Sequence, residues 1–185
     1  MGITLHYKGT LNNPIDKDNV IAVITDIAEN AGWSIQKIDD EDKHLRGVIL
    51  GVHEKCEPLP FLFDAYGQLR SVFWLIDIAK PTELWIFSKT QFAGVEAHIV
   101  SIKFLEFMKK NYISNLEVND ETEYWTHRDI NILQQKFQQM NFIIDSVGAA
   151  LNNLKFDREK ESIDELVNKI EKSFEDVHNK IKNKL

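Results

Sequence analysis

The sequence predicts an α+β protein in which helices cover a mostly antiparallel sheet of five or six strands, followed by a C-terminal antiparallel helical hairpin. Three observations support this fold class. Short segments alternate apolar and polar residues, two segments before residue 113 carry apolar residues at helical spacing, and the last third of the chain holds two long heptad patterns. We therefore expect an α+β core over residues 1–128 and a helical hairpin over residues 129–185.

The chain is expected to open with a strand and a helix. Ile3, Leu5 and Tyr7 alternate with polar residues, which is the period of a strand with one buried face. From about Asp16 the apolar spacing becomes helical. Gly32 stands where this helix is expected to end, because glycine enters the left-handed conformation beyond a helix C-terminus without steric cost.

The middle of the chain has the pattern of a sheet. Residues 33–38 and 45–52 are strand candidates, separated by a charged turn. Residues 61–69 form the clearest predicted hairpin. Asp64 can accept hydrogen bonds from turn amides there, and Gly67 supplies the positive φ that such a turn requires.

Two more strands and a second helix are expected next. Residues 71–78 should return from the hairpin, and residues 84–87 are apolar on both faces, as in a covered central strand. Gly94 opens a helix that is apolar on more than one side, so we expect it to be covered on more than one side. A short extended segment follows at residues 116–118.

The C-terminal third carries two heptad patterns that are out of phase. Nine positions separate Leu154 from Ile163, which fits neither a heptad nor the insertions that coiled coils tolerate. Ser162 and Glu165 have the spacing of a capping box at a new helix start. We therefore predict two antiparallel helices joined within residues 155–161. The apolar positions are Ile130, Leu133, Phe137, Met140, Ile144, Val147, Leu151 and Leu154 in the first pattern, and Ile163, Val167, Ile170, Phe174, Val177 and Ile181 in the second.

These apolar stripes have two interpretations. In the first, the two arms pack on each other and on the body of their own chain, as most amphipathic helices do. In the second, the hairpin pairs with a protein partner or with a second copy, forming a four-helix bundle with twofold symmetry. The second arm is the expected partner-facing element. Its interface residues would be Ile163, Val167, Ile170, Phe174, Val177 and Ile181.

Composition argues against several classes of function. The chain has 29 acidic and 22 basic residues, a net charge of −7, and no basic stripe interleaved with aromatic residues, so nucleic-acid binding is disfavoured. It has no signal-peptide pattern and no apolar run of about 20 residues that would span a membrane. Its single cysteine, Cys56, excludes an internal disulfide. We expect a cytoplasmic protein without membrane contact.

No nucleotide-binding glycine loop, nucleophile elbow or zinc-helix motif is present, so candidate chemistry rests on looser clusters. His53, Cys56 and Glu57 lie close together at a strand end. With His127, they offer nitrogen, sulfur and oxygen donors suited to a transition metal. The structural alternative is a polar strand end with a buried cysteine, and for His127 a polar loop beside a helix cap at Thr126 or Asp129.

The junction between the strand at 84–87 and the helix at Gly94 is the candidate ligand site. Unpaired amides and the helix dipole favour an anion at such a helix start. The side chains expected to contribute are Lys89, Thr90, Gln91, Glu96 and His98. The alternative is an ordinary junction in which Glu96 complements the dipole and His98 is a hydrogen-bonded core residue.

These patterns support two hypotheses about function. The leading one is a non-catalytic, cytoplasmic interaction or regulatory protein that self-associates through the hairpin. The alternative is a small-ligand-binding protein or metal-dependent enzyme that uses the junction at residues 89–98. The sequence identifies no catalytic residue, cofactor or specific partner.

Overall fold

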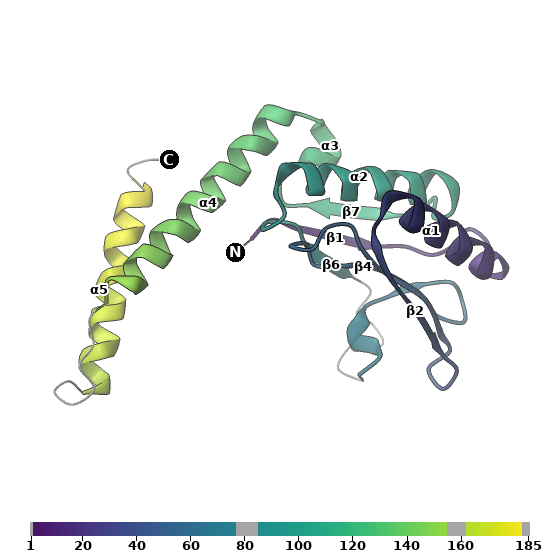
Figure 1. Ribbon diagram of the computed structural model, residues 1–185, viewed down its shortest axis with the longest axis horizontal. Helices are drawn as coiled ribbons and strands as arrows, with labels where there is room; N and C mark the ends of the chain where they lie inside the picture. The colour runs from purple at the N-terminus through teal and green to yellow at the C-terminus, as the bar shows by residue number, and fades with distance from the viewer. Residues whose placement is uncertain (1, 77–84, 155–161, 183–185) are drawn as a thin grey trace. The chain divides into compact units, whose positions relative to one another are not determined.

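The computed structural model of the protein describes residues 2–76, 85–154 and 162–182. It shows the predicted α+β class, with antiparallel sheets and a C-terminal pair of helices (Figure 1). The chain divides into two compact units, Met1–Gln134 and Gln135–Leu185. We describe each by itself.

The first unit contains two antiparallel sheets, so the prediction of one five- to six-stranded sheet is wrong. The described strands form a three-stranded sheet in the order β6-β1-β7 and a four-stranded sheet in the order β2-β3-β4-β5. Alternation along a segment predicts which face is buried but not which strands pair, because pairing is set by contacts distant in sequence. The strands are β1 (Thr4–Lys8), β2 (Ser34–Asp40), β3 (Leu45–Gly51), β4 (Leu59–Phe63), β5 (Leu69–Arg70), β6 (Ile86–Lys89) and β7 (Glu117–Asp120).

The chain beyond β1 connects the two sheets. Leu69 N–H donates to the carbonyl of Gly9 at 2.9 Å, and Leu11 N–H donates to the carbonyl of Gly67 at 2.9 Å. Thr10 and Gln68 form an isolated antiparallel bridge between these bonds. The segment after β1 therefore borders the β4–β5 hairpin, although β1 itself pairs with β6 and β7.

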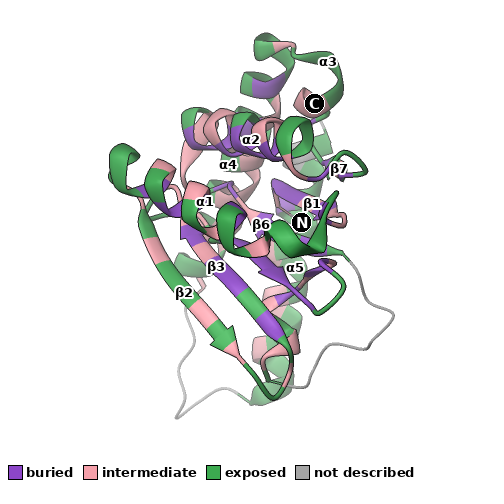
Figure 2. Cartoon of the chain, turned by 90° about the vertical axis from the view of Figure 1, so that its right-hand side faces the viewer, coloured by how far each residue is buried: buried purple, intermediate pink, exposed green. Residues whose placement is uncertain are grey.

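Two helices cover the sheets of this unit (Figure 1). Helix α1 (Lys17–Ala31) follows the short 3₁₀ helix η1 (Pro14–Asp16) and contacts β2 and β3. It ends as predicted at Gly32, whose φ is 69° and whose N–H bonds to the carbonyls of Ala28 and Glu29. Helix α2 (Gly94–Asn111) buries one broad face, which extends from Phe104 to Ile102 around the helix, and Figure 2 shows buried positions on both α2 and β3.

One aromatic cluster joins the two sheets and α2. The rings of Tyr7 and Phe61 stack at 5.8 Å, and Phe104 of α2 meets Phe61 edge to face at 5.3 Å. Tyr7 is fully buried, and its hydroxyl donates to the Pro60 carbonyl at 2.9 Å. Burial also raises the pKa of Tyr7 well above its usual value, because a phenolate has no water to solvate it there. β1 and β4 therefore share one core.

The β4–β5 hairpin has the predicted turn. Asp64 Oδ1 accepts hydrogen bonds from Tyr66 N–H at 2.8 Å and Gln68 N–H at 3.0 Å. Gly67 has a φ of 77°, as expected from its position. Asp64 Oδ2 also accepts from Arg70 Nε at 2.9 Å, so one carboxylate holds both the turn and the following strand.

Two strand predictions after this hairpin are wrong. Ser71 caps a 3₁₀ helix, η2 (Val72–Trp74), instead of beginning a strand over residues 71–78, and residues 77–78 lie outside the described part. β6 is an edge strand rather than a covered central one, and Phe87 on it is exposed. In residues 85–87, Ile86 faces the core, whereas Trp85 and Phe87 are exposed aromatic side chains. Both faces are therefore apolar although only one is buried.

The remaining helices begin with the predicted caps. After the short helix α3 (Tyr124–His127), Asp129 Oδ1 accepts from Asn131 N–H at 2.8 Å and caps α4 (Ile130–Asn152). Helix α5 (Ile163–Lys182) begins with the capping box: Ser162 N–H donates to Glu165 Oε2 at 2.7 Å, and Glu165 N–H donates to Ser162 Oγ at 3.2 Å. The predicted connection at residues 155–161 lies outside the described part.

The second unit is a pair of helices, formed by α5 and the part of α4 after Gln134. α5 runs back along α4 (Figure 1). Side chains from both helices, including Ala150 and Val177, line a cavity of about 370 Å³. The two arms therefore meet without complete packing. No described helix is both long and apolar enough to cross a lipid bilayer.

Candidate functional site

The most completely organised polar cluster in the described residues surrounds His98. Its Nδ1 lies 2.8 Å from Thr90 Oγ1, at the end of β6, and its Nε2 lies 3.1 Å from Thr122 Oγ1, beyond β7. Nε2 also lies 3.3 Å from Asp120 Oδ1. All four side chains are buried. The cluster therefore joins α2 to the ends of two strands in the interior of the unit.

Hydrogen-bond capacity determines one proton position in this cluster. The Thr122 hydroxyl oxygen lies 2.8 Å from each oxygen of the Asp120 carboxylate. An ionised carboxylate only accepts hydrogen bonds, so the Thr122 hydroxyl must use its hydrogen to donate to Asp120. Thr122 Oγ1 is therefore left to accept from His98, so Nε2 carries a hydrogen. Nδ1 then either accepts from the Thr90 hydroxyl or donates to it, depending on the charge of the imidazole.

The Asp120 carboxylate is stabilised in its charged form despite burial. Burial alone would raise its pKa, but the hydrogen bond and positive charge of His98, together with N–H donors from the backbone, outweigh burial and lower the pKa. The donors are Thr122 N–H at 2.8 Å and Trp125 N–H at 2.9 Å. A buried carboxylate with this many donors is a structural anchor.

The same cluster fixes the N-terminal strand. Thr90 N–H donates to the Ile3 carbonyl at 2.9 Å, and Ile3 N–H donates to Gln91 Oε1 at 3.2 Å. Gly94 opens α2 with a φ of 89°, and Ala93 N–H bonds back to the Thr90 carbonyl at 3.0 Å. Thr90 and Gln91 therefore use their polar groups to hold the chain around them.

The structure brings together only part of the predicted ligand site. Thr90, Gln91 and His98 are no more than 5% exposed, so a ligand from solvent does not reach them in this conformation. Lys89 is half-buried and Glu96 is exposed, and neither side chain joins the buried cluster. Asp120 and Thr122 complete the cluster but were missed in the sequence, because nothing in their local pattern indicates contact with a residue 22 or 24 positions earlier.

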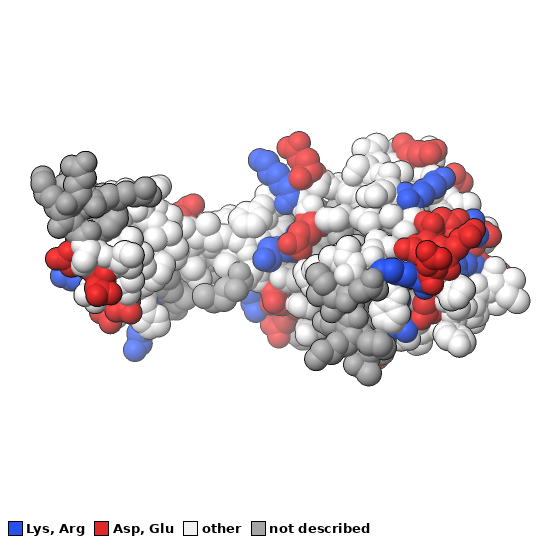
Figure 3. Space-filling view, turned by 90° about the horizontal axis from the view of Figure 1, so that it is seen from below, with Lys and Arg blue, Asp and Glu red and all other residues white. Residues whose placement is uncertain are grey.

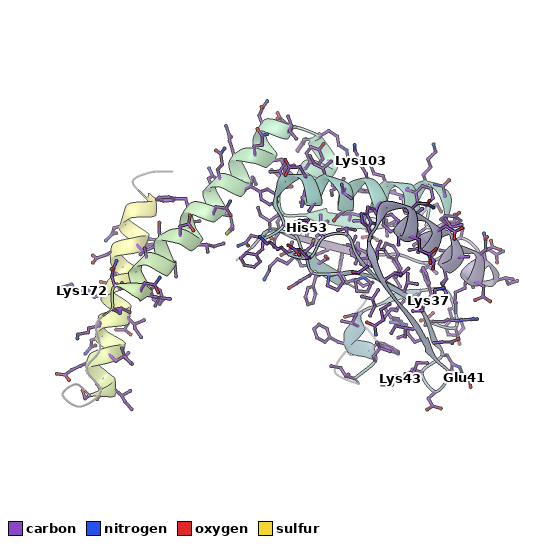
Figure 4. The ribbon with its side chains drawn as sticks, in the orientation of Figure 1. Lys37, Glu41, Lys43, His53, Lys103 and Lys172 are labelled. Atoms are coloured by element: carbon purple, nitrogen blue, oxygen red, sulfur yellow. The ribbon has the colours of Figure 1, made fainter. Side chains whose placement is uncertain are left out.

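The predicted metal ligands do not form a cluster in the described residues. His53 is exposed, and its side chain is labelled in Figure 4; its Nδ1 accepts from Lys55 N–H at 3.1 Å. Glu57 Oε2 accepts from Lys89 N–H at 2.9 Å, and His127 is an exposed residue of α3. Within residues 2–76, 85–154 and 162–182, no group of three His, Cys, Asp or Glu side chains is placed to hold a metal ion.

Cys56 is a protected thiol. Burial is the main cause that raises its pKa to about 11; the Glu57 charge acts in the same direction, and hydrogen bonds with Ser101 and Ser88 act in the opposite direction. Its sulfur lies 3.6 Å from the Lys89 carbonyl. A thiol with this pKa is almost entirely protonated at neutral pH, so it is a poor nucleophile and a poor metal ligand.

Acidic side chains gather at the tip of the β2–β3 hairpin (Figure 3), where Asp39 to Asp42 follow one another without interruption. Arg46 offsets part of this charge through Asp39 at 3.2 Å and Asp18 at 2.8 Å. These are exposed ion pairs, which contribute little to stability. Negative charge here disfavours contact with a phosphate backbone.

Several of the predicted interface residues on helix α5 are exposed apolar side chains. With 3.6 residues per turn, Val167 and Phe174 lie along one edge of the stripe, and Ile170 and Val177 lie along the other. Val177 is buried and Ile170 is half-buried, whereas Val167 is 45% and Phe174 43% exposed. Ile163 is 77% exposed. Ile181 is also a predicted interface residue, but its side chain lies outside the described part of the chain.

Comparisons with protein-family models, with curated proteins and with solved structures gave no match. The functional argument therefore rests on the geometry of this chain.

Proposed function

We propose that this protein is a non-catalytic interaction protein that self-associates through the exposed apolar edge of α5. The observation that carries the proposal is the division of the α5 stripe: Val177 is buried, while Val167 and Phe174 remain in contact with solvent on the same helix. Contiguous apolar side chains on an otherwise charged helix favour an interface with another helix.

The size of the surface predicts a weak dimer. At about 1.5–3 kcal/mol for a fully buried large apolar side chain, the exposed fractions of Ile163, Val167 and Phe174 contribute about 2.5–5 kcal/mol per protomer. Twofold symmetry doubles this contribution, and the loss of rotational and translational freedom opposes it. With an association cost of at least about 4 kcal/mol, at most about 6 kcal/mol remains, so we expect a dissociation constant between about 40 μM and 1 mM.

Sedimentation equilibrium of the full chain tests the proposal. The double variant Val167→Gln, Phe174→Gln should lower self-association by at least about tenfold, because it removes apolar surface without touching the buried edge. Lys172→Gln is the matched control, since Lys172 lies on the exposed polar side of the same helix (Figure 4). A single-protomer mass for the unmodified protein at about 1 mM contradicts the proposal.

The alternative, ligand binding or metal-dependent catalysis at residues 89–98, has less support. The hydroxyl of Thr90, the amide of Gln91 and the imidazole of His98 form hydrogen bonds within the protein and are buried. An active site requires reacting groups that a substrate can reach. An exposed binding surface therefore accounts for more of the geometry.

A further inference from the structure

A second apolar feature lies at the edge of β6, within the first unit. It is a cavity of about 200 Å³ between β6, the start of β4 and η2. An apolar cavity of about 150 Å³ accommodates benzene, so this one holds a single aromatic ring. Its lining residues are Glu57, Pro58, Pro60, Ser71, Val72, Phe73, Ile86 and Phe87.

Backbone direction shows what faces this cavity. Thr90 N–H donates to the Ile3 carbonyl, so Thr90 directs its backbone groups towards β1. Backbone groups alternate sides along a strand, and Lys89 therefore points away from β1. This is observed: the Lys89 carbonyl accepts from Glu57 N–H, and Lys89 N–H donates to Glu57 Oε2, both at 2.9 Å.

Phe87 lies two residues before Lys89 and directs its N–H and carbonyl to the same side. There it meets Pro58 and Pro60, which lack N–H groups and therefore cannot continue the pairing that Glu57 begins. No described residue forms a backbone hydrogen bond with Phe87 on that side. The edge thus offers one donor and one acceptor beside an apolar cavity.

Two exposed aromatic residues line the cavity. Phe73 is 37% and Phe87 43% exposed, and their rings lie 5.8 Å apart. These two side chains present roughly 120–200 Å² if each carries about 150–250 Å². A stable interface between folded proteins needs about 800 Å² from each partner. The area therefore fits a short segment and is too small for a second folded copy.

We propose that the edge of β6 binds an extended peptide segment of a partner protein. The segment pairs with the backbone N–H and carbonyl of Phe87 and places one aromatic side chain in the cavity. Strand addition supplies affinity through main-chain hydrogen bonds, and the cavity selects the side chain. This site lies in the first unit and does not depend on self-association through α5.

Nuclear magnetic resonance of the ¹⁵N-labelled full chain, titrated with the blocked tripeptide Ac-Val-Phe-Val-NH₂, tests the proposal. We expect saturable binding with a dissociation constant of about 1 mM and a shift of the Phe87 amide resonance. The same peptide with N-methylated internal amides should bind about tenfold more weakly, because it cannot donate to the Phe87 carbonyl.

Two variants locate the site. Phe73→Ala should weaken tripeptide binding at least about fivefold, because it removes one wall of the cavity. Phe92→Ala is the control: Phe92 is exposed but does not line the cavity, so binding should be unchanged. Absence of a Phe87 shift overturns the proposal. Equal affinity for the N-methylated peptide, or for toluene, which offers a ring without a backbone, also overturns it.

Discussion

The sharpest test of the interior concerns Asp120. We expect Asp120→Ala to lower the free energy of unfolding by about 3–5 kcal/mol, because it removes a buried carboxylate that accepts several hydrogen bonds. The substitution leaves the Thr122 hydroxyl, Thr122 N–H and Trp125 N–H without their acceptor in the core. Each buried group that loses its partner carries a desolvation cost of about 1–3 kcal/mol.

Chemical denaturation followed by circular dichroism measures this loss. Asp120→Asn retains one oxygen acceptor and should cost less, about 1–3 kcal/mol. Asn119→Ala is the matched control, because Asn119 is the exposed neighbour on the same strand, and it should change stability by no more than about 0.5 kcal/mol. If Asp120→Asn and Asn119→Ala are equally stable at pH 7, the network has no anchoring role.

The pH dependence gives an independent check with a definite sign. The pKa of Asp120 is lowered in the folded protein. Its contribution is therefore fully present above the unfolded value of about 3.9 and is lost as the pH falls through the lower folded value. The stability difference between the unmodified protein and Asp120→Asn should shrink below about pH 4. A difference that grows there contradicts the assignment.

Two further outcomes follow from local geometry. Gly47→Ala should destabilise the protein by about 1–3 kcal/mol in chemical denaturation, because the new Cβ would stand 2.0 Å from the Phe61 carbonyl oxygen. In the control Gly148→Ala, the new Cβ meets nothing within 4 Å, so the change should be neutral or stabilising by up to about 1 kcal/mol. Alkylation of Cys56 by iodoacetamide at pH 8 should be about two orders of magnitude slower than that of a free thiol, since its pKa is about 11, and Glu57→Gln should accelerate it by removing a nearby negative charge. Equal costs for the two glycine variants, or alkylation at the free-thiol rate, would contradict these expectations.

The features predicted correctly from sequence are those encoded within a few neighbouring residues. The end of α1 at Gly32, the Asp64 turn with Gly67, and the capping box of Ser162 with Glu165 each depend on atoms in one or two turns of chain. The choice of residue and the geometry are coupled directly in such motifs, because the same side chain both permits the conformation and satisfies its amides.

The features that sequence reasoning missed depend on strand partners. An apolar segment such as residues 84–87 reads alike whether it lies in the centre of a sheet or at its edge with an aromatic outer face. The sequence leaves His98 either in a ligand site or hydrogen-bonded in the core, and its partners, Asp120 and Thr122, follow from the pairing of β7 with β1. That pairing is a long-range contact, and alternation within a strand carries no information about it.

The distribution of polar and apolar groups is the basis on which we propose binding rather than catalysis. In the described residues, the titratable pair His98 and Asp120 is buried and bonded within the chain, and no buried side-chain nitrogen or oxygen lacks a hydrogen-bond partner. Several large apolar side chains are left in solvent, such as Phe174 on α5 and Phe87 on β6. Solvent exposure of apolar area is unfavourable and is relieved by association. The described buried polar side chains of this chain already have hydrogen-bond partners. Covering its exposed apolar side chains with another molecule would therefore be the main source of favourable free energy on binding.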